Sequence, residues 1–281
     1  MLTTALRYIA EHPRRAWNAL ARDPISIWDT LHDRIVQNRE YKRPPYAPDT
    51  DPKWEEKLAA WIPSEPWGVR DEFTELWPRV IASVEALGVP TGPMSFNGYN
   101  DGDSAFVRAI WRLVRGLRPV HVVETGVAHG FTSRLILEAL ERNRSGRLWS
   151  IDRVPFDPAM RAQVGIAVGQ PQPFRWRLIE GTSRRRLPAL LSSLGCVDLF
   201  IHDSLHTEQN VHFEMNCAWD VLRPGGAMVI DDIDSNWGFE EFLKTHGGYT
   251  PLICEAEPIK PDPRRFNGKG LFGIILKDER A

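Results

Sequence analysis

The chain has 281 residues, of which 42% are hydrophobic and 26% are charged, as is typical of a globular protein with one large domain or a domain plus an extension. Its formal net charge of −2 excludes the global basic field of proteins that bind nucleic acid regardless of sequence. The sequence contains no apolar run near the roughly 20 residues of a membrane span and no recognisable secretory signal. The three cysteines are sparse, so we expect a cytoplasmic protein without a disulfide scaffold.

The first third of the chain predicts helices joined by a proline-rich connector. Residues 1–41 carry apolar side chains near a 3.6-residue period, and a second helix is predicted over residues 71–88. The connector, residues 43–68, holds one short helical piece, "WEEKLAAW". Six of the eleven tryptophans precede residue 80, which predicts that this region packs against something. We interpret residues 1–93 as a helical extension, a candidate lid or dimer surface, and residues 94–281 as the main domain.

The main domain predicts an α/β fold of the Rossmann-like type. A polar loop, "NGYNDGD", leads to a helix capped by Asp103 or Ser104. From residue 120 onward, apolar runs alternate with helical stretches, which is typical of parallel strands joined by helices. The last two apolar runs have no strong helix between them, so we expect an antiparallel last strand. The result is a mostly parallel seven-stranded sheet. The seven apolar runs are residues 120–125, 147–152, 174–180, 197–203, 227–232, 250–257 and 269–277.

The stretch "HVVETGVAHGFTS" reads as a strand, a glycine turn and the start of a helix. Gly126 permits a sharp turn, and Gly130 opens a helix whose free N–H groups attract polar ligand groups, to which Thr132 or Ser133 could add a hydroxyl. Asp152 ends the next apolar run, where a carboxylate accepts hydrogen bonds from the ribose of an adenosine ligand. A turn without a ligand, with a solvated aspartate at a strand end, is the alternative.

The spacing of the turn argues against a dinucleotide. Ala128 stands where the G-x-G-x-x-G fingerprint has its middle glycine, and Gly130 comes one residue early. Glu124 would repel phosphates but would attract an ammonium group through a charge-assisted bond. An adenosine ligand with an ammonium group and no phosphate is S-adenosylmethionine. His129 could touch the cofactor or the substrate, or merely fill the loop.

With these residues in place, "VVETGVAHGFTS" resembles the first motif of class I S-adenosylmethionine-dependent methyltransferases. The similarity is to the metal-dependent O-methyltransferase branch, which contains caffeoyl-CoA, catechol and macrocin-type sugar O-methyltransferases, and it covers roughly residues 95–277. Many relatives have an aspartate where Thr182 stands. The resemblance implies that the methionine end of the cofactor is held by Glu124, Gly126 and Gly130, the ribose by Asp152, and the adenine by Thr182 and Ser183.

Two further motifs end strands in acidic residues, "FIHDSLHTEQN" (200–210) and "MVIDDIDSN" (228–236). Asp203, Asp231 and Asp232 should meet near the cofactor's methyl group, because the carboxyl ends of adjacent parallel strands face one crevice. Three carboxylates repel one another unless a cation lies between them, and such ligands suit Mg²⁺, or Ca²⁺ and Mn²⁺. The resemblance places a divalent ion at these positions. The alternative is that the aspartates are helix caps or solvated turns.

His206 follows Asp203 on the loop into the next helix and is a candidate general base. It could also be a metal ligand, a helix cap or a surface histidine. His202 should point to the opposite face of the sheet, so we interpret it as a packing residue.

These patterns predict an O-methyltransferase that acts on a hydroxyl of a saccharide, a glycoside or a related small molecule. Magnesium or another divalent ion would align the acceptor, with His206 and Asp203 as the catalytic residues. The alternatives are a catechol or phenolic O-methyltransferase, an NAD-type dehydrogenase and a non-catalytic cofactor-binding protein. We expect no nucleic-acid partner, and the N-terminal region is a candidate homodimer surface.

Overall fold

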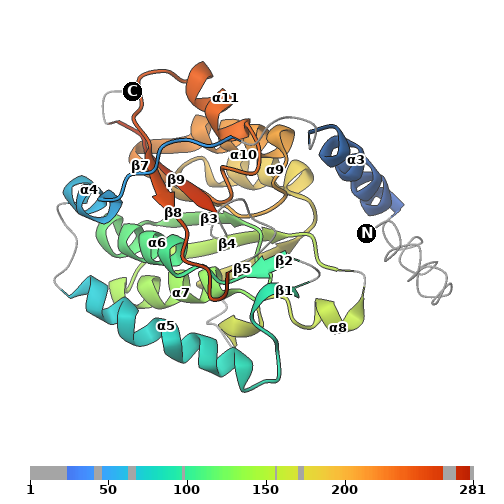
Figure 1. Ribbon diagram of the computed structural model, residues 1–281, viewed down its shortest axis with the longest axis horizontal. Coiled ribbons are helices and arrows are strands. Elements are labelled where there is room, and N and C mark those ends of the chain that lie inside the picture. The colour runs from blue at the N-terminus through green and yellow to red at the C-terminus, as the bar shows by residue number, and fades with distance from the viewer. Residues whose placement is uncertain are drawn as a thin grey trace.

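The computed structural model describes residues 24–40, 46–62, 68–96, 99–155, 157–169, 174–261 and 270–278. The helical prediction for residues 1–23 lies outside this part of the chain. The sheet at the centre has the strand order β5-β4-β3-β6-β7-β9-β8 (Figure 1). Its seven strands are β3 (His121–Thr125), β4 (Arg147–Asp152), β5 (Trp176–Glu180), β6 (Val197–His202), β7 (Leu222–Ile230), β8 (Leu252–Glu255) and β9 (Leu271–Leu276).

The direction of the strands confirms the predicted fold. Strands β3 to β7 pair in parallel, whereas β9 runs antiparallel to both β7 and β8. β3 lies between β4 and β6, so the strand order reverses at β3, and ligands of such sheets bind at the carboxyl ends of the strands at this point. β7 is longer than the apolar run predicts, because it already begins at Leu222 in "LRPGG".

Helices cover both faces of the sheet, in the three layers expected of parallel strands joined by helical crossovers (Figure 1). Val122 and Leu199 face the layer formed by α4 to α7, and Val123 and Phe200 face α9 to α11. The helices are α3 (Pro24–Glu40), α4 (Trp54–Trp61), α5 (Val69–Glu85), α6 (Ser104–Leu117), α7 (Phe131–Asn143), α8 (Pro158–Arg161), α9 (Ser183–Leu194), α10 (Glu208–Val221) and α11 (Gly238–Thr245), with a short 3₁₀ turn at Ile166–Val168.

Helices α4 and α5 share the hydrophobic core of the main domain. Trp54 and Trp77 are buried in the same cluster as the side chains of α6 and α7. The buried Trp111 of α6 donates from its indole nitrogen to the carbonyl of Val69 at 3.0 Å. Burial of aromatic side chains is a large stabilising term, so the shared cluster holds these two helices on the main domain.

A short antiparallel pair precedes α6: β1 (Gly92–Phe96) lies before the predicted polar loop, and β2 (Tyr99–Asp101) lies within it. This pair was not predicted, because its residues show no regular alternation of apolar and polar side chains. Asp103 is the N-cap of α6, one of the two predicted, and its carboxylate accepts from the amide of Phe106 at 2.8 Å.

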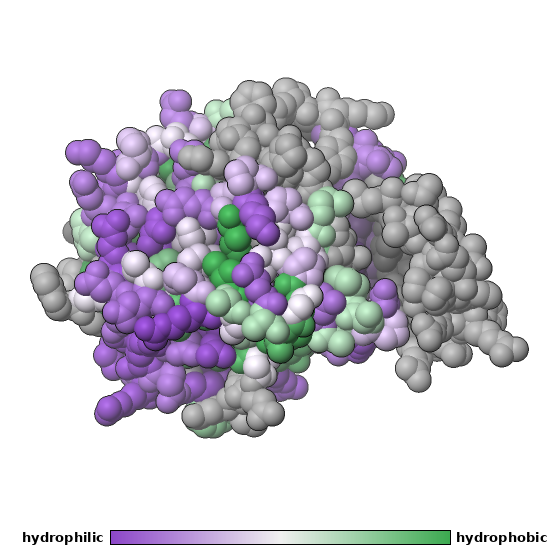
Figure 2. Space-filling model, turned by 60° about the horizontal axis from the view of Figure 1, so that its bottom comes forward, coloured by the Kyte–Doolittle hydropathy of each residue, from purple (hydrophilic) through white to green (hydrophobic). Residues whose placement is uncertain are grey.

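Among the described residues on the face shown in Figure 2, hydrophilic side chains dominate the left side and hydrophobic ones gather near the centre. The large hydrophobic side chains that are exposed in the described part of the chain are Ile35, Leu87, Met94, Val120 and Phe174. Among the described helices, none combines the length and the apolar character that crossing a bilayer requires.

Candidate functional site at the carboxyl edge of the sheet

The glycine turn after β3 packs closely against the backbone of two neighbouring loops. Gly126 has a φ of +87°, and a Cβ added there would lie 1.8 Å from the backbone oxygen of Asp203. Gly130 has a φ of +84°, and its added Cβ would meet the Cα of Gly165 at 2.8 Å. Both positions need glycine because the turn is pressed against two neighbouring loops. The turn therefore lies directly against the loop that carries Asp203.

Glu124 lies beneath this turn and is fully buried. Its Oε2 accepts hydrogen bonds from Ser133 Oγ at 2.6 Å and from Ser150 Oγ at 2.7 Å, and the indole of Trp176 donates to Ser150 at 2.9 Å. Burial raises the pKa of Glu124 to about 7, against the effect of the two serine hydroxyls, and the charge of Asp152 adds to the rise. Oε1 is buried and has no hydrogen-bond partner among the described residues.

Asp152, at the end of β4, organises the turn. Its Oδ2 accepts from the backbone amides of Val127 at 3.0 Å and Ala128 at 3.1 Å. Burial raises the pKa of Asp152, while these two bonds and the nearby charge of Arg153 lower it. These two bonds do not engage Oδ1, the second oxygen of this carboxylate.

The other predicted cofactor residues lie at two helix starts. Thr132 is half-buried in the first turn of α7, and Ser133 beside it donates to Glu124. Thr182 is the N-cap residue of α9 and donates to Asp29 Oδ2 of α3 at 3.3 Å. Ser183 is buried and donates to Asn210 Oδ1 at 3.3 Å. Three of the four hydroxyls thus have protein partners.

Asp203, His206 and Asp231 meet at the ends of β6 and β7. One ligand atom from each lies within 4.8 Å of the other two, and all three side chains are half-buried. His206 Nε2 lies 3.7 Å from Asp203 Oδ1 and 3.8 Å from Asp232 Oδ2. The convergence that parallel strand ends predict is therefore present, with His206 in the group and Asp232 at its edge.

A second buried glutamate, which the sequence analysis missed, lies under the same loop. Glu214 of α10 is fully buried, and its Oε2 is 2.7 Å from Nδ1 of the buried His202. Its Oε1 accepts from Ser204 Oγ at 2.7 Å and Asn210 Nδ2 at 2.9 Å. Burial alone would raise the pKa of Glu214, but the charge of His202 and the hydrogen bonds from His202, Ser183 and Thr125 outweigh it and lower this pKa to about 2. His202 is thus buried as one half of a polar pair, and its ring packs edge-on against that of His206, with centroids 5.4 Å apart.

A signal for Glu214 is present in the sequence. Val211, Met215 and Ala218 form the buried stripe of α10, and Glu214 falls on that stripe. A carboxylate on the apolar face of a helix needs a buried partner.

His129 fills the glycine turn. Its side chain is fully buried, and Nε2 lies 3.2 Å from Gln163 Oε1. The ring packs edge-on against Phe96 and Phe131, with centroids 5.0 Å and 6.4 Å away. Of the two predicted roles, this position supports the filling of the loop.

Comparison with known proteins agrees with this geometry. Residues 123–233, from β3 to just beyond β7, match a family model described as a methyltransferase domain. No curated protein matches the chain in sequence. Two solved structures show the same fold at low identity.

The first is the O-methyltransferase TomG from Streptomyces achromogenes, involved in tomaymycin synthesis and solved with S-adenosylmethionine. It has 16% identity and a TM-score of 0.51, over 72% of this chain and 89% of that one. The second is an O-methyltransferase from Bacillus cereus, solved with S-adenosylhomocysteine. It has 13% identity and a TM-score of 0.50, over 78% and 100% of the two chains. The family match identifies a methyltransferase domain in residues 123–233, and the two solved structures share its fold.

Proposed function

We propose that the chain is an S-adenosylmethionine-dependent O-methyltransferase that uses a divalent cation to methylate a hydroxyl of a saccharide or glycoside. One observation carries the proposal. The glycine turn touches the backbone of Asp203, whose side chain meets His206 and Asp231 within 4.8 Å. A cofactor held at the turn and an acceptor held at this cluster would therefore be direct neighbours, as in-line transfer requires.

The residues at the turn fit the cofactor. Glu124 Oε1 is a buried acceptor with no partner among the described residues, and an ammonium group is the ligand that would offset its burial. Asp152 Oδ1 is not engaged by the glycine turn and could accept from a ribose hydroxyl. When bound, the cofactor supplies an electrophilic methyl group. The chain's contribution is to hold it in place and to exclude water through the packed turn.

The cluster at Asp203, His206 and Asp231 fits a divalent cation. Two carboxylates and an imidazole at this spacing form a donor set of oxygen and nitrogen atoms that binds such ions. When bound, the cation would hold the acceptor oxygen and lower the pKa of its hydroxyl. Asp232, close to His206, adds negative charge at the edge of the site.

His206 is the candidate for moving the acceptor's proton. Its Nε2 faces Asp203 and Asp232, so a proton held at Nε2 would lie between two carboxylates that stabilise it. Nδ1 is buried without a hydrogen-bond partner among the described residues. The imidazole would thus act as a base or, in the alternative role, as a ligand of the cation.

The acceptor class rests on the sequence resemblance and on simple geometry. "FIHDSLHTEQN" and "LRPGGAMVIDD" resemble the bacterial glycan and macrolide branch more than the plant phenolic branch, and this resemblance supports a saccharide or glycoside acceptor. Neighbouring hydroxyls of a sugar could both reach one cation.

A product assay tests this proposal. The protein is incubated with S-adenosylmethionine, Mg²⁺ and panels of glycosides and catechols, and S-adenosylhomocysteine is measured. We expect turnover with glycosides. We expect Asp203→Asn, Asp231→Asn and EDTA each to lower it by about 10²-fold or more. Asp220→Asn, at an exposed position of α10, is the matched control. Full activity of both variants in EDTA would refute the proposed role of the metal. Turnover with catechols alone would refute the proposed glycoside acceptor.

A further inference from the structure

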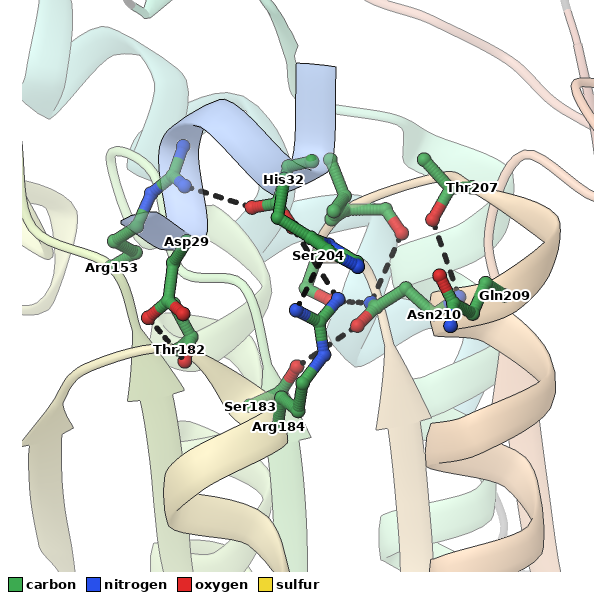
Figure 3. Close-up of polar contacts among 12 residues, drawn as sticks. Asp29, His32, Arg153, Thr182, Ser183, Arg184, Ser204, Thr207, Gln209 and Asn210 are labelled. Carbon is green, nitrogen blue, oxygen red and sulfur yellow. Dashed lines mark hydrogen bonds and ion pairs between the residues drawn. The ribbon is translucent and has the colours of Figure 1, made fainter. Parts of the chain in front are cut away.

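Helix α3 lies across the carboxyl edge of the sheet, outside the segment that matches the methyltransferase family (Figure 3). Its acidic side chains contact the loops after β4 and β5. Asp33 Oδ2 accepts from Arg153 Nη1 at 3.0 Å, and Asp33 Oδ1 accepts from Arg184 Nη2 at 3.4 Å. One turn earlier, Asp29 accepts from Arg185 and from Thr182.

These contacts surround the residues assigned to the adenosine end of the cofactor. Arg153 directly follows Asp152, the candidate ribose ligand, and its charge lowers the pKa of Asp152 against the effect of burial. Thr182 and the adjoining Ser183 are the candidate adenine contacts. Each segment that would touch the nucleoside is therefore tied to α3 by a carboxylate.

Both aspartates of α3 that make these contacts are largely buried. The side chain of Asp33 is only 10% exposed, and that of Asp29 is 13% exposed. Burying a carboxylate is costly unless charged or polar donors satisfy it, and two arginines satisfy Asp33.

The end of α3 is also anchored. Glu40 accepts from the amides of Glu208 and Gln209 at 2.7 and 3.2 Å, at the start of α10. This carboxylate meets the positive end of the α10 dipole, just beyond the loop that carries Asp203 and His206.

We propose that α3 forms the outer wall of the cofactor site and that Asp29 and Asp33 are positioning residues for its adenosine end. Asp33 holds Arg153 beside Asp152, and Asp29 fixes the start of α9. Ligand exchange then requires these contacts to loosen. This inference rests on the proposed cofactor function, because it assigns a wall to the same site.

The test compares full-length variants with the wild type in binding S-adenosylhomocysteine, by calorimetry for affinity and by stopped-flow tryptophan fluorescence for dissociation. We expect Asp33→Asn to raise the dissociation constant by about tenfold, through faster dissociation, the change that about 1.4 kcal/mol produces. Asp33→Glu should restore most of the loss. In the transfer assay, Asp33→Asn should raise the KM for the cofactor and leave kcat unchanged.

Asp29→Asn is the second variant, because α3 keeps its Asp33 contacts there, and it should weaken binding by about threefold. Glu75→Gln, at an exposed ion pair with Arg79 on α5, is the matched control and should bind like the wild type. Unchanged affinity in both aspartate variants would overturn the inference, and tighter binding would do so too, because it would mean that α3 obstructs the site. A wild type that does not bind the ligand would instead refute the proposed function.

Discussion

Glu124 and Glu214 are two fully buried glutamates near the same edge of one sheet, and their surroundings shift their pKa values in opposite directions. Glu124 meets only two serine hydroxyls, so burial dominates and its pKa rises to about 7. Glu214 meets His202 and several neutral donors, so its pKa falls to about 2. Thr125, the neighbour of Glu124 on β3, donates to Glu214 from the opposite face.

The difference teaches that burial of a carboxylate does not by itself mark a binding site. Both carboxylate oxygens of Glu214 have hydrogen-bond partners in the protein, and these bonds connect β3, β6 and α10 beneath the Asp203 loop. Glu124 is not satisfied, because Oε1 has no partner among the described residues. An unsatisfied buried acceptor is the better candidate for a ligand contact.

Loss of Glu214 should destabilise the fold more than loss of Glu124. Glu214→Ala leaves His202 and three further donors without their acceptor, and the expected cost is about 3–5 kcal/mol in the free energy of unfolding. Glu124→Ala leaves only hydroxyls unpaired, at a cost of about 1–3 kcal/mol. Urea unfolding at pH 5, where folded Glu124 is protonated and Glu214 is ionised, measures both, and equal losses would contradict the contrast.

The two glutamates should respond to pH in opposite directions. The folded-state pKa of Glu124 is raised, so its contribution to stability is present below pH 4.5 and is lost as the pH rises through about 7. The expected change, relative to Glu124→Gln, is on the order of 3 kcal/mol. The lowered pKa of Glu214 gives stability above pH 4.5 that is lost as the pH falls towards 2. Unfolding measured from pH 5 to 8 should show the Glu124 effect, and identical pH profiles of the wild type and Glu124→Gln would argue against it.

Cofactor affinity should depend on Glu124 through its charge. Glu124→Gln keeps the size of the side chain but loses a charge-assisted bond of about 1.5–3 kcal/mol, so we expect the dissociation constant to rise by about 10- to 100-fold. Binding near pH 6.5 should release a proton, visible as a dependence of the calorimetric heat on the buffer. If Glu124→Gln binds the cofactor as tightly as the wild type, the proposed contact between Glu124 and the ammonium group is wrong.

The smallest effect is expected far from the sheet edge. Glu75 and Arg79 form an exposed i,i+4 pair on α5. Glu75→Gln should change the free energy of unfolding by at most about 0.5 kcal/mol and should not change cofactor binding. Thermal unfolding with and without ligand measures this baseline, and a larger effect would mean that α5 is coupled to the site.

The sequence could predict the elements that hydrophobic burial controls. The apolar runs of the main sheet stand out because parallel strands are buried on both faces. The same reasoning brought Asp203 and Asp231 together, since parallel strand ends share one edge.

The parts that were missed depend on contacts between distant segments. Asp29 and Thr182 are 153 residues apart in the chain, and nothing local in either segment indicates that they meet. Likewise, the partner of Glu214 follows from how α10 packs against β6. The role of residues 1–93 as a lid or a dimer surface, and the domain boundary after residue 93, stay predictions. Helices α4 and α5 nonetheless share the core of the main domain.

Calorimetric titration of the wild-type protein with S-adenosylmethionine and with NAD⁺, followed by the same titrations of Glu124→Gln, tests the central claim most directly. The account predicts one site for S-adenosylmethionine, no binding of NAD⁺, and a weaker site in the variant. Tight binding of NAD⁺, or no binding of S-adenosylmethionine to the wild type, would contradict it.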